Sequence, residues 1–374
     1  MGVEIKEVKD RGDLKRFVKF PFELYRNNPY WVPPMIKDEL DTFSSKENPA
    51  FEHCEAKLWL ALDNGEIVGR ICGILHRTEI EKKKLGRFGW IDFIDDQEVS
   101  KKLINTVESW CKEKGLKGLH GPLGFTDLDF EGMLVEGFDE IGTIATIYNH
   151  SYYPRHLEAL GFLKAADWVE MEATVPQEVP YRIKRKAEII EGRFKFRSLS
   201  FKSAKDMLPY GKAIFDIIND SYKDLYGYWP LTNKQIDKYI SQYLSFINPK
   251  FSSVVVNKDD EVVGFGITMP SLSRAYQKAK GRLFPFGFIH LLRALKRNST
   301  ADFYIVGILP DYQKMGIPLL FFRDIWPQLI KRGIRKVYSN PALEDNHGVL
   351  NHWMEYQDNH RVRKRRRCYV RKIA

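Results

Sequence analysis

The stretch from Asp302 to Arg335 constrains the fold of this chain more than any other segment. Its first part, Phe303 to Leu309, is a short apolar run with β-branched residues and turn residues on both sides, a pattern that is typical of a buried strand. Apolar residues then recur at helical spacing from Ile317 to Ile330, and Gly333 follows where a helix would end. We therefore predict a strand, a loop that contains Gly316, and a helix.

A loop in this position points free backbone N–H groups, and the positive end of the helix dipole, at whatever lies above it. Both features favour a negatively charged ligand such as a phosphate or a pyrophosphate. The loop is therefore a candidate anion site, although a plain connection between a strand and a helix, with no ligand, would have the same pattern.

The segment Pro310 to Leu319 resembles the acyl-CoA loop of the GNAT superfamily of N-acyltransferases. Members of that family follow a strand with proline, an acidic residue and an aromatic residue, and then with Gln or Arg, two residues, glycine, one residue, and glycine or alanine. Gln313 and Gly316 match the first two marked positions, and Pro318 departs from the third. Proline has no N–H group, so this departure removes one phosphate donor.

The resemblance implies that the loop holds acetyl-CoA or another acyl-CoA as co-substrate. The residues that it assigns to the coenzyme are Ile308, Leu309, Gln313, Lys314, Met315, Gly316, Ile317, Pro318 and, after the next strand, Asn346.

Length and charge narrow the class of protein. A chain of 374 residues is long for one domain and suits two domains. With 44% hydrophobic and 29% charged residues, nothing indicates a disordered, collagen-like or coiled-coil protein. The net charge of +10 favours an anionic partner, and a coenzyme, a nucleic acid, a peptidoglycan precursor and an acidic membrane surface all qualify.

The four cysteines are scattered, with no Cys-x-x-Cys motif and no histidines at zinc-finger spacing. We therefore expect neither disulfides nor a metal site. The first residues lack the apolar core of a signal peptide, and no stretch of about 18 apolar residues is present. These observations predict a cytoplasmic protein.

The two halves of the chain repeat one order of elements, which indicates an internal duplication. In the first half, strands at 56–62, 67–75 and 88–93 precede a helix at 99–114; in the second, strands at 253–257, 261–269 and 303–309 precede the helix at 317–330. Matching residues recur in the same order: Asp95 and Asp311, Trp110 and Trp326, Gly115 and Gly333. We predict an N-terminal domain at 1–175, a linker with a basic helix at 176–197 and a C-terminal domain at 198–374.

The expected fold class is α/β (mixed α+β), with two GNAT-like domains, each a twisted mixed sheet flanked by helices. In the family, a splay in the strand before the loop aims a backbone N–H at the thioester carbonyl, and a tyrosine protonates the leaving thiolate. By resemblance these roles fall on Gly307, which would suit a bulge, and on Tyr356. Trp353 stands where the family's tyrosine is expected, and a purely structural Trp and Tyr is the alternative.

The first half is complementary to the second. Asn149, Tyr152 and Tyr153 resemble the family's Asn and Tyr segment better than the second half does. Asp95 and Asp96, however, occupy the loop position with acidic side chains, which would repel a pyrophosphate. We therefore expect this half to be degenerate for coenzyme binding.

Acceptor recognition falls, by resemblance, on the aromatic loop that contains Tyr226, Tyr228 and Trp229, with core packing as the alternative. The apolar and aromatic segment at 283–297 has basic residues at its edges. It suits a peripheral membrane contact or a cover for an acyl chain, although many such stretches are buried helices. The basic tail at 361–367 is expected in the final strand, facing solvent or the coenzyme, and no nucleic-acid partner is expected.

The sequence thus predicts an N-acyltransferase that transfers an acyl group, an acetyl group in the simplest case, from acyl-CoA to the primary amine of a small molecule or peptide by direct attack. A Fem-like aminoacyl or long-chain acyl transferase of the same architecture is one alternative. A tandem protein that binds a ligand without catalysis is the other.

Overall fold

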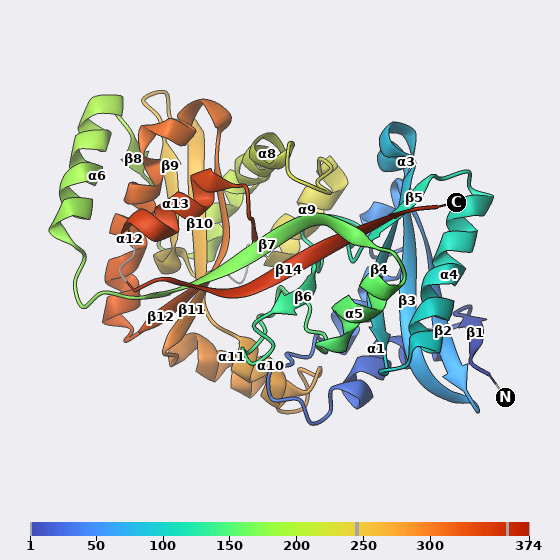
Figure 1. Cartoon of the computed structure of the whole chain (residues 1–374). Helices are drawn as coiled ribbons and strands as arrows, with labels where there is room; N and C mark the ends of the chain where they lie inside the picture. The colour runs from blue at the N-terminus through green and yellow to red at the C-terminus, as the bar shows by residue number, and fades with distance from the viewer. Residues whose placement is uncertain (1, 244–246, 357–358, 374) are drawn as a thin grey trace. The chain divides into compact units, whose positions relative to one another are not determined.

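The computed structural model of the chain describes residues 2–243, 247–356 and 359–373, without the side chains at 243, 352 and 354–356 (Figure 1). The α-helices are α1 (Arg11–Leu24), α2 (Ile36–Thr42), α3 (Arg77–Lys83), α4 (Gln97–Glu113), α5 (Tyr152–Ala159), α6 (Tyr181–Phe194), α7 (Ala204–Met207), α8 (Gly211–Tyr222), α9 (Asn233–Tyr243), α10 (Ser273–Ala279), α11 (Gly287–Lys296), α12 (Ile317–Lys331) and α13 (His347–Tyr356). Short 3-10 helices are η1 (Pro49–Glu52), η2 (Leu208–Tyr210), η4 (Pro249–Phe251) and η5 (Pro310–Met315).

The strands are β1 (Glu4–Glu7), β2 (Cys54–Asp63), β3 (Glu66–His76), β4 (Leu85–Phe93), β5 (Gly118–Gly121), β6 (Met133–Glu136), β7 (Leu163–Thr174), β8 (Arg197–Ser198), β9 (Ser252–Val256), β10 (Val262–Pro270), β11 (Thr300–Ile308), β12 (Lys336–Ser339), β13 (Ala342–Leu343) and β14 (Arg361–Lys372). The mixed α/β class expected from the sequence is confirmed.

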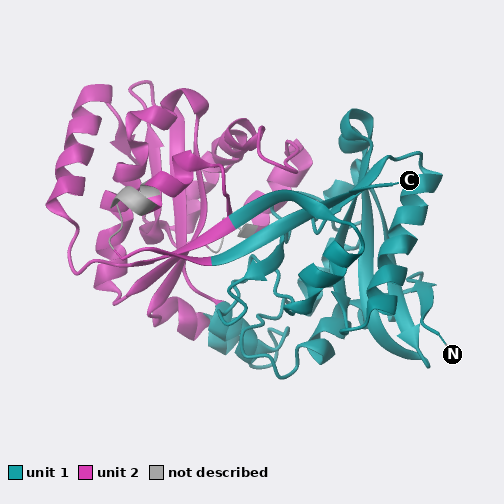
Figure 2. Ribbon diagram, in the orientation of Figure 1, with its two compact units in different colours: residues 1–168, 273–291, 364–374 teal, residues 169–272, 292–363 magenta. Residues whose placement is uncertain are grey.

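The chain divides into two compact units (Figure 2). Unit 1 comprises residues 1–168, 273–291 and 364–374, and unit 2 comprises residues 169–272 and 292–363. Contacts therefore group two segments from the second half of the sequence with unit 1. One is the insertion around α10, and the other is most of β14.

The sheets of the two units have the same plan. In unit 1 the strands follow the order β1-β2-β3-β4-β5-β14, and in unit 2 the order is β8-β9-β10-β11-β12-β7. Neighbouring strands in these two orders pair antiparallel, except β4 with β5 and β11 with β12, which are parallel and occupy equivalent places. In each unit the long helix, α4 or α12, follows the first strand of the parallel pair. The duplication predicted from the order of elements is present in the fold.

The last strand of each sheet comes from the other half of the sequence. Tyr369 and Val370 of β14 pair with Gly121 and His120 of β5 in unit 1, while the end of β7 pairs with β12 in unit 2. Cys368 and Tyr369 are buried, at 0% and 1% exposure, so this strand is part of the core of unit 1.

Burial of β14 corrects the expectation that the basic tail faces solvent. Arg363, Lys364 and Arg366 are at most 3% exposed. Arg366 donates a hydrogen bond to the carbonyl of Ile147, and Arg367 holds the carboxylate of Asp167 with two bonds of 2.8 and 3.0 Å. The three buried cations are therefore part of the interior, while Arg361 of the same run is exposed.

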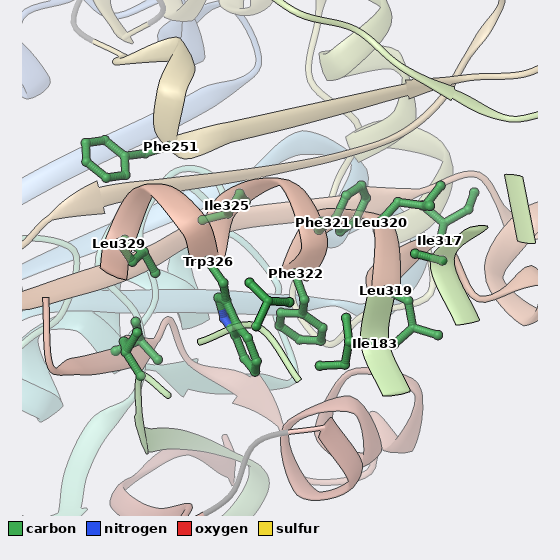
Figure 3. Close-up of a cluster of buried hydrophobic side chains, with 14 of the residues drawn as sticks. Ile183, Phe251, Ile317, Leu319, Leu320, Phe321, Phe322, Ile325, Trp326 and Leu329 are labelled. Carbon is green, nitrogen blue, oxygen red and sulfur yellow. The ribbon is translucent and has the colours of Figure 1, made fainter. Parts of the chain in front are cut away.

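Equivalent glycines allow the long helices to approach their sheets. A Cβ atom on Gly69 would lie 2.8 Å from Leu103 of α4, and one on Gly264 would lie 3.1 Å from Ile317 of α12. In unit 2 the apolar side chains of α12 fill the core, and Figure 3 shows Phe322 and Leu319 beside Ile183 of α6. The apolar spacing that predicts this helix is therefore its packing surface.

Removing β14 tests its role in unit 1. A chain truncated after residue 363 loses a buried strand that pairs with both β5 and β6, so we expect unit 1 to lose its protection against amide hydrogen exchange while unit 2 keeps most of its own. A chain that lacks only residues 373–374 is the control and should exchange like the full chain. Full protection of β5 in the chain that ends at residue 363 would contradict the role of β14 in the core of unit 1.

Candidate functional site

In unit 2 the strand β11 pairs with its parallel neighbour β12 over only the first half of its length. The pairing with β12 runs from Thr300 to Phe303 and then stops. In the ladder with β10, Ile305 lies opposite Ile267 and Phe303 lies opposite Thr268, so Tyr304 is an extra residue. Such a bulge bends a strand, and here it opens the sheet at the point where the coenzyme was expected.

This register corrects the expectation of a bulge at Gly307. The glycine lies in regular register opposite Phe265, and a Cβ atom there would lie 2.7 Å from the Phe265 ring and 2.9 Å from Ile217. Close packing therefore accounts for the glycine. Its proposed catalytic role stays a prediction.

Side chains close part of the edge that β11 exposes beyond the bulge. Tyr222 donates a hydrogen bond of 2.8 Å to the carbonyl of Val306, and the amide of Asn340 donates one to the carbonyl of Tyr304. A ligand that added itself to this edge would have to displace these bonds. The sequence did not predict these contacts of Tyr222 and Asn340, since no local pattern shows which strand their side chains reach.

The residues assigned to the coenzyme loop divide into exposed and buried ones. Pro310–Met315 forms η5, in which Gln313 and Lys314 are exposed. Ile317 and Pro318 are buried at the start of α12. Ile308, Leu309 and Met315 pack against the core of unit 2 and are half-buried. A ligand on this loop would therefore meet the backbone and the two exposed side chains.

The start of α12 offers fewer free donors than a typical helix N-terminus. Pro318 has no N–H group, and the N–H of Leu319 donates to the carbonyl of Gly316 at 3.0 Å. Gly316 adopts a left-handed conformation, with φ of 77°, and Ile190 of α6 would lie 2.5 Å from a Cβ atom there. Any substitution at Gly316 would therefore disturb the packing as well as a ligand.

Asn346 and Tyr356 mark the two ends of α13. The side-chain oxygen of Asn346 accepts a hydrogen bond from the N–H of Val349 at 3.3 Å, as an N-capping residue does. Tyr356 is the last residue of α13, and its side chain lies outside the part of the chain that the structure describes. Trp353 is buried and packs edge-on against Phe303 at 5.4 Å.

The aromatic residues predicted for the acceptor differ in exposure. Tyr228 is 4% exposed and donates a hydrogen bond of 2.6 Å to Asn219, so it belongs to the core. Tyr226 and Trp229 are half-buried. Their assignment to the acceptor remains a prediction.

Unit 1 repeats the bulge and adds backbone strain. Trp90 and Ile91 of β4 lie opposite the single residue Ile71 of β3, and the parallel pairing with β5 ends at Arg87. Trp90 has a φ of 43°, which is an unfavourable conformation for a bulky L-residue. Strain of this kind is common at functional sites, so it marks the opening in β4 as a candidate site.

A cavity lies beside this bulge in unit 1. Its walls are aromatic and apolar with a few polar groups, and the lining residues are Pro21, Tyr25, Trp31, Val32, Pro34, Glu39, Arg70, Trp90, Ile91, Asp92, Pro122, Phe130, Met133, Thr146, Ile147, Tyr148, Asn149 and Tyr153. The cavity has about 60 Å³ of room, which is enough for roughly four water molecules. A small number of polar groups in an apolar hollow is the usual composition of a binding site.

Glu39, on the first turn of α2, is the acid in this cavity whose pKa is most altered. It is 6% exposed, and its carboxylate accepts a hydrogen bond of 2.9 Å from the indole N–H of Trp90. Burial raises the pKa of Glu39 to about 7, although the Arg70 charge and the Trp90 bond lower it. A carboxylate with this pKa can accept a proton near neutral pH.

Asp92 is held by a buried network on the other wall. Arg70 donates to one of its oxygens at 2.8 Å, and Tyr25 donates to the other at 2.7 Å. The hydroxyl of Tyr25 also lies 2.9 Å from that of Tyr153, which in turn accepts a hydrogen bond from the backbone N–H of Phe93. Burial raises the pKa of Tyr153 well above its ordinary value, so this phenol stays protonated.

The beginning of α4 does not suit a phosphate. Asp96 caps the helix by accepting a bond of 2.7 Å from the N–H of Glu98, and Asp95 lies 2.8 Å from His156. The first-half residues Asn149 and Tyr152 are bonded to the backbone of β6 and β4, at Leu134 and Phe93. That this half is degenerate for coenzyme binding stays a prediction.

Solved structures of GNAT proteins have the same fold as this chain. A tandem GNAT protein from the clavulanic acid biosynthesis pathway has a TM-score of 0.56 and 11% identity, with 100% of this chain and 99% of that chain covered. A fungal GCN5-related glucosamine N-acetyltransferase region has a TM-score of 0.57 and 14% identity, covering 99% of this chain and 38% of its own. The chain has the tandem GNAT fold that its sequence motifs predicted.

Two curated proteins are similar over most of their length. Protein YghO from Escherichia coli strain K12 is 29% identical over 357 residues, which are 93% of this chain and 90% of YghO. The bacterial ceramide synthase of Caulobacter vibrioides is 29% identical over 319 residues, 82% of this chain and 80% of that protein. No family model matches the chain. Among the described residues, no helix has the length and apolar character needed to cross a bilayer.

The raised pKa of Glu39 predicts a loss of stability as pH rises. The pKa is 4.5 when unfolded and about 7 when folded, so the unfolded state ionises first and stability falls between these values. Glu39→Gln removes this titration. The free energy of unfolding of the variant, relative to the native chain, should therefore rise by about 3 kcal/mol from pH 4.5 to pH 8.

Urea unfolding at several pH values measures this difference. The exposed residue Glu66 gives the control, because Glu66→Gln should leave the pH dependence of the native chain unchanged. Parallel curves for Glu39→Gln and the native chain would mean that Glu39 is ordinarily acidic in the folded protein.

Proposed function

We propose that this protein is an N-acyltransferase that transfers an acyl group from a thioester to the primary amine of a long-chain, lipid-like acceptor. The observation that carries the proposal is the cavity beside the strained Trp90, with Glu39 as its base. The fold, which it has in common with GCN5-related acetyltransferases, supports the same reaction class.

The residues of the cavity match what amide formation requires. The amine nitrogen attacks the thioester carbonyl, a C–N bond forms, and the C–S bond breaks. Glu39 takes the proton that the amine loses, and Tyr153, a phenol that lines the same cavity, is the proposed donor of a proton to the leaving thiolate. The apolar walls keep water away from the thioester and would raise the cost of charging the amine.

Within unit 2 we keep the loop at 309–318 as a proposed site for a coenzyme diphosphate, and we do not assign to it the thioester that reacts in the cavity of unit 1. Gln313 and Lys314 are exposed on it, and Lys314 supplies a positive charge. The acidic start of α4 makes unit 1 the less suitable place. A Fem-like aminoacyl transferase, which would not use an acyl-CoA, is the alternative that a coenzyme-binding measurement separates.

The long-chain acceptor is inferred from one relative and one surface. The relative is the bacterial ceramide synthase, and a ceramide is the amide of a fatty acid with a long-chain amino alcohol. The surface lies on the insertion of unit 1, where Phe284 and Phe286 are 74% and 69% exposed. Large exposed aromatic residues of this kind are typical of contact with a membrane or a lipid.

This insertion is fastened beside the cavity. The side chain of Gln277 donates hydrogen bonds to the carbonyls of Pro29 and Trp31, at 2.8 and 2.9 Å, and Trp31 lines the cavity. Lys280 and Arg282 are exposed next to the aromatic residues and would meet anionic headgroups. A membrane contact here would bring a lipid amine close to the proposed site.

The function is tested with the purified full chain, palmitoyl-CoA or acetyl-CoA, and sphinganine or ethanolamine as amine. We expect release of free thiol and an amide product, detected by mass spectrometry, that require the long-chain amine. Glu39→Gln should lower kcat about a hundredfold or more at pH 7, and Glu66→Gln should not. No amide with any of these pairs would contradict the proposal.

The proposed coenzyme site on the loop at 309–318 is tested by a separate binding measurement. Lys314→Glu should weaken coenzyme A binding about tenfold or more, measured by thermal shift, because it places a negative charge on the loop. Lys331→Glu makes the same charge change at the far end of α12 and is the control. Equal affinity in both variants would place the diphosphate elsewhere.

The membrane contact is tested by sedimentation with anionic vesicles. Phe284→Ser combined with Phe286→Ser should weaken vesicle binding at least tenfold, since each exposed ring contributes about 1.5 kcal/mol or more when it enters the bilayer interface. Tyr181→Ser, which removes an aromatic ring that is 77% exposed on unit 2, is the control. Unchanged binding of the double variant would exclude this surface.

A further inference from the structure

Three nitrogen and sulfur ligands meet at the open end of the β2–β3 hairpin in unit 1. His53 precedes β2, Cys54 is its first residue, and His76 is the last residue of β3. One ligand atom from each residue, an imidazole nitrogen or the thiol sulfur, lies within 4.8 Å of the other two. None of these residues belongs to the cavity beside Trp90.

We propose that these three side chains bind a divalent transition metal ion of the zinc class. Imidazole nitrogen and thiolate sulfur are preferred ligands of Zn²⁺, two imidazoles and one thiolate also suit copper, and hard cations such as Mg²⁺ prefer oxygen. A water molecule would complete the tetrahedron. The site is separate from the proposed acyl transfer and does not depend on it.

The backbone holds the ligands in place. Cys54 and His76 are directly opposite each other in the antiparallel ladder, and the N–H of Arg77 donates a bond of 2.9 Å to the carbonyl of His53. Ligand atoms around a tetrahedral zinc ion are about 3.3 to 3.6 Å apart, by the usual bond lengths. The side chains therefore have to move inward by about 1 Å to bind the ion, and His53 is the half-buried member of the three.

The surroundings are compatible with a cation. Two arginines, Arg87 and the exposed Arg77, act on the cluster, and Arg87 is paired with Glu79 through a bond of 2.6 Å. Glu52 acts on His53, and Asp129 acts on Cys54, so carboxylates also face the cluster. Cys54 and His76 are 7% and 4% exposed, while His53 leaves a path to solvent.

Ordinary packing of these three side chains, without an ion, would give the same burial. A metal-binding measurement distinguishes ordinary packing from a metal site. The full chain, freed of metal with a chelator, is titrated with Zn²⁺ against a chromophoric competitor and with Co²⁺ by absorbance. We expect one ion per chain and, with Co²⁺, the near-ultraviolet charge-transfer band of a thiolate ligand. Cys54→Ser should abolish that band, and Cys111→Ser, which alters another buried cysteine of unit 1, should leave it unchanged.

His53→Gln keeps the test decisive if Cys54→Ser does not fold. This residue is half-buried, so the variant should fold and should bind Zn²⁺ roughly tenfold or more weakly. No bound ion in the native chain, no thiolate band, or an unchanged affinity in His53→Gln would each overturn the proposal.

Discussion

The parting of two parallel strands is the constraint on which the rest of each unit depends. β4 and β5 pair only from Leu85 to Arg87, and β11 and β12 only from Thr300 to Phe303. Beyond these points one extra residue, Trp90 or Tyr304, bends the strand away from its neighbour. A sheet that opens in this way leaves a polar edge in its middle, and that edge has to be bonded by side chains, by water or by a ligand.

The two units meet this requirement differently. In unit 2, Tyr222 and Asn340 donate hydrogen bonds to carbonyl groups of the open strand. In unit 1 the opening contains a cavity, a strained Trp90 and a buried acid with a pKa of about 7. A fold that only needed stability would not place an ionisable carboxylate there, because burying it without a full partner costs free energy.

The sequence predicted the order of strands and helices, because apolar periodicity is a local property. It also predicted the duplication, through matching residues such as Gly115 and Gly333. The structure adds the equivalent glycines Gly69 and Gly264, which pack under α4 and α12. It placed the bulge of β11 at Gly307, since glycine is the usual marker. A bulge is set by the register between two strands, however, and Tyr304 carries no local signal for it.

Long-range pairing also explains what the sequence could not show about the side chains. Glu39 is one acid in a polar helix, and its pKa is raised only because β4 and α2 bury it against Trp90. From the sequence, the basic run at 361–367 is expected in the final strand with its side chains facing solvent or the coenzyme, and pairing of β14 in the sheet instead gives Arg367 a partner in Asp167. Cys54 and His76 are 22 residues apart in the sequence and become neighbours only through the register of β2 and β3. In each case the chemistry of the residue follows from a partner that is distant in the chain, so the local pattern indicates its type and the fold assigns its role.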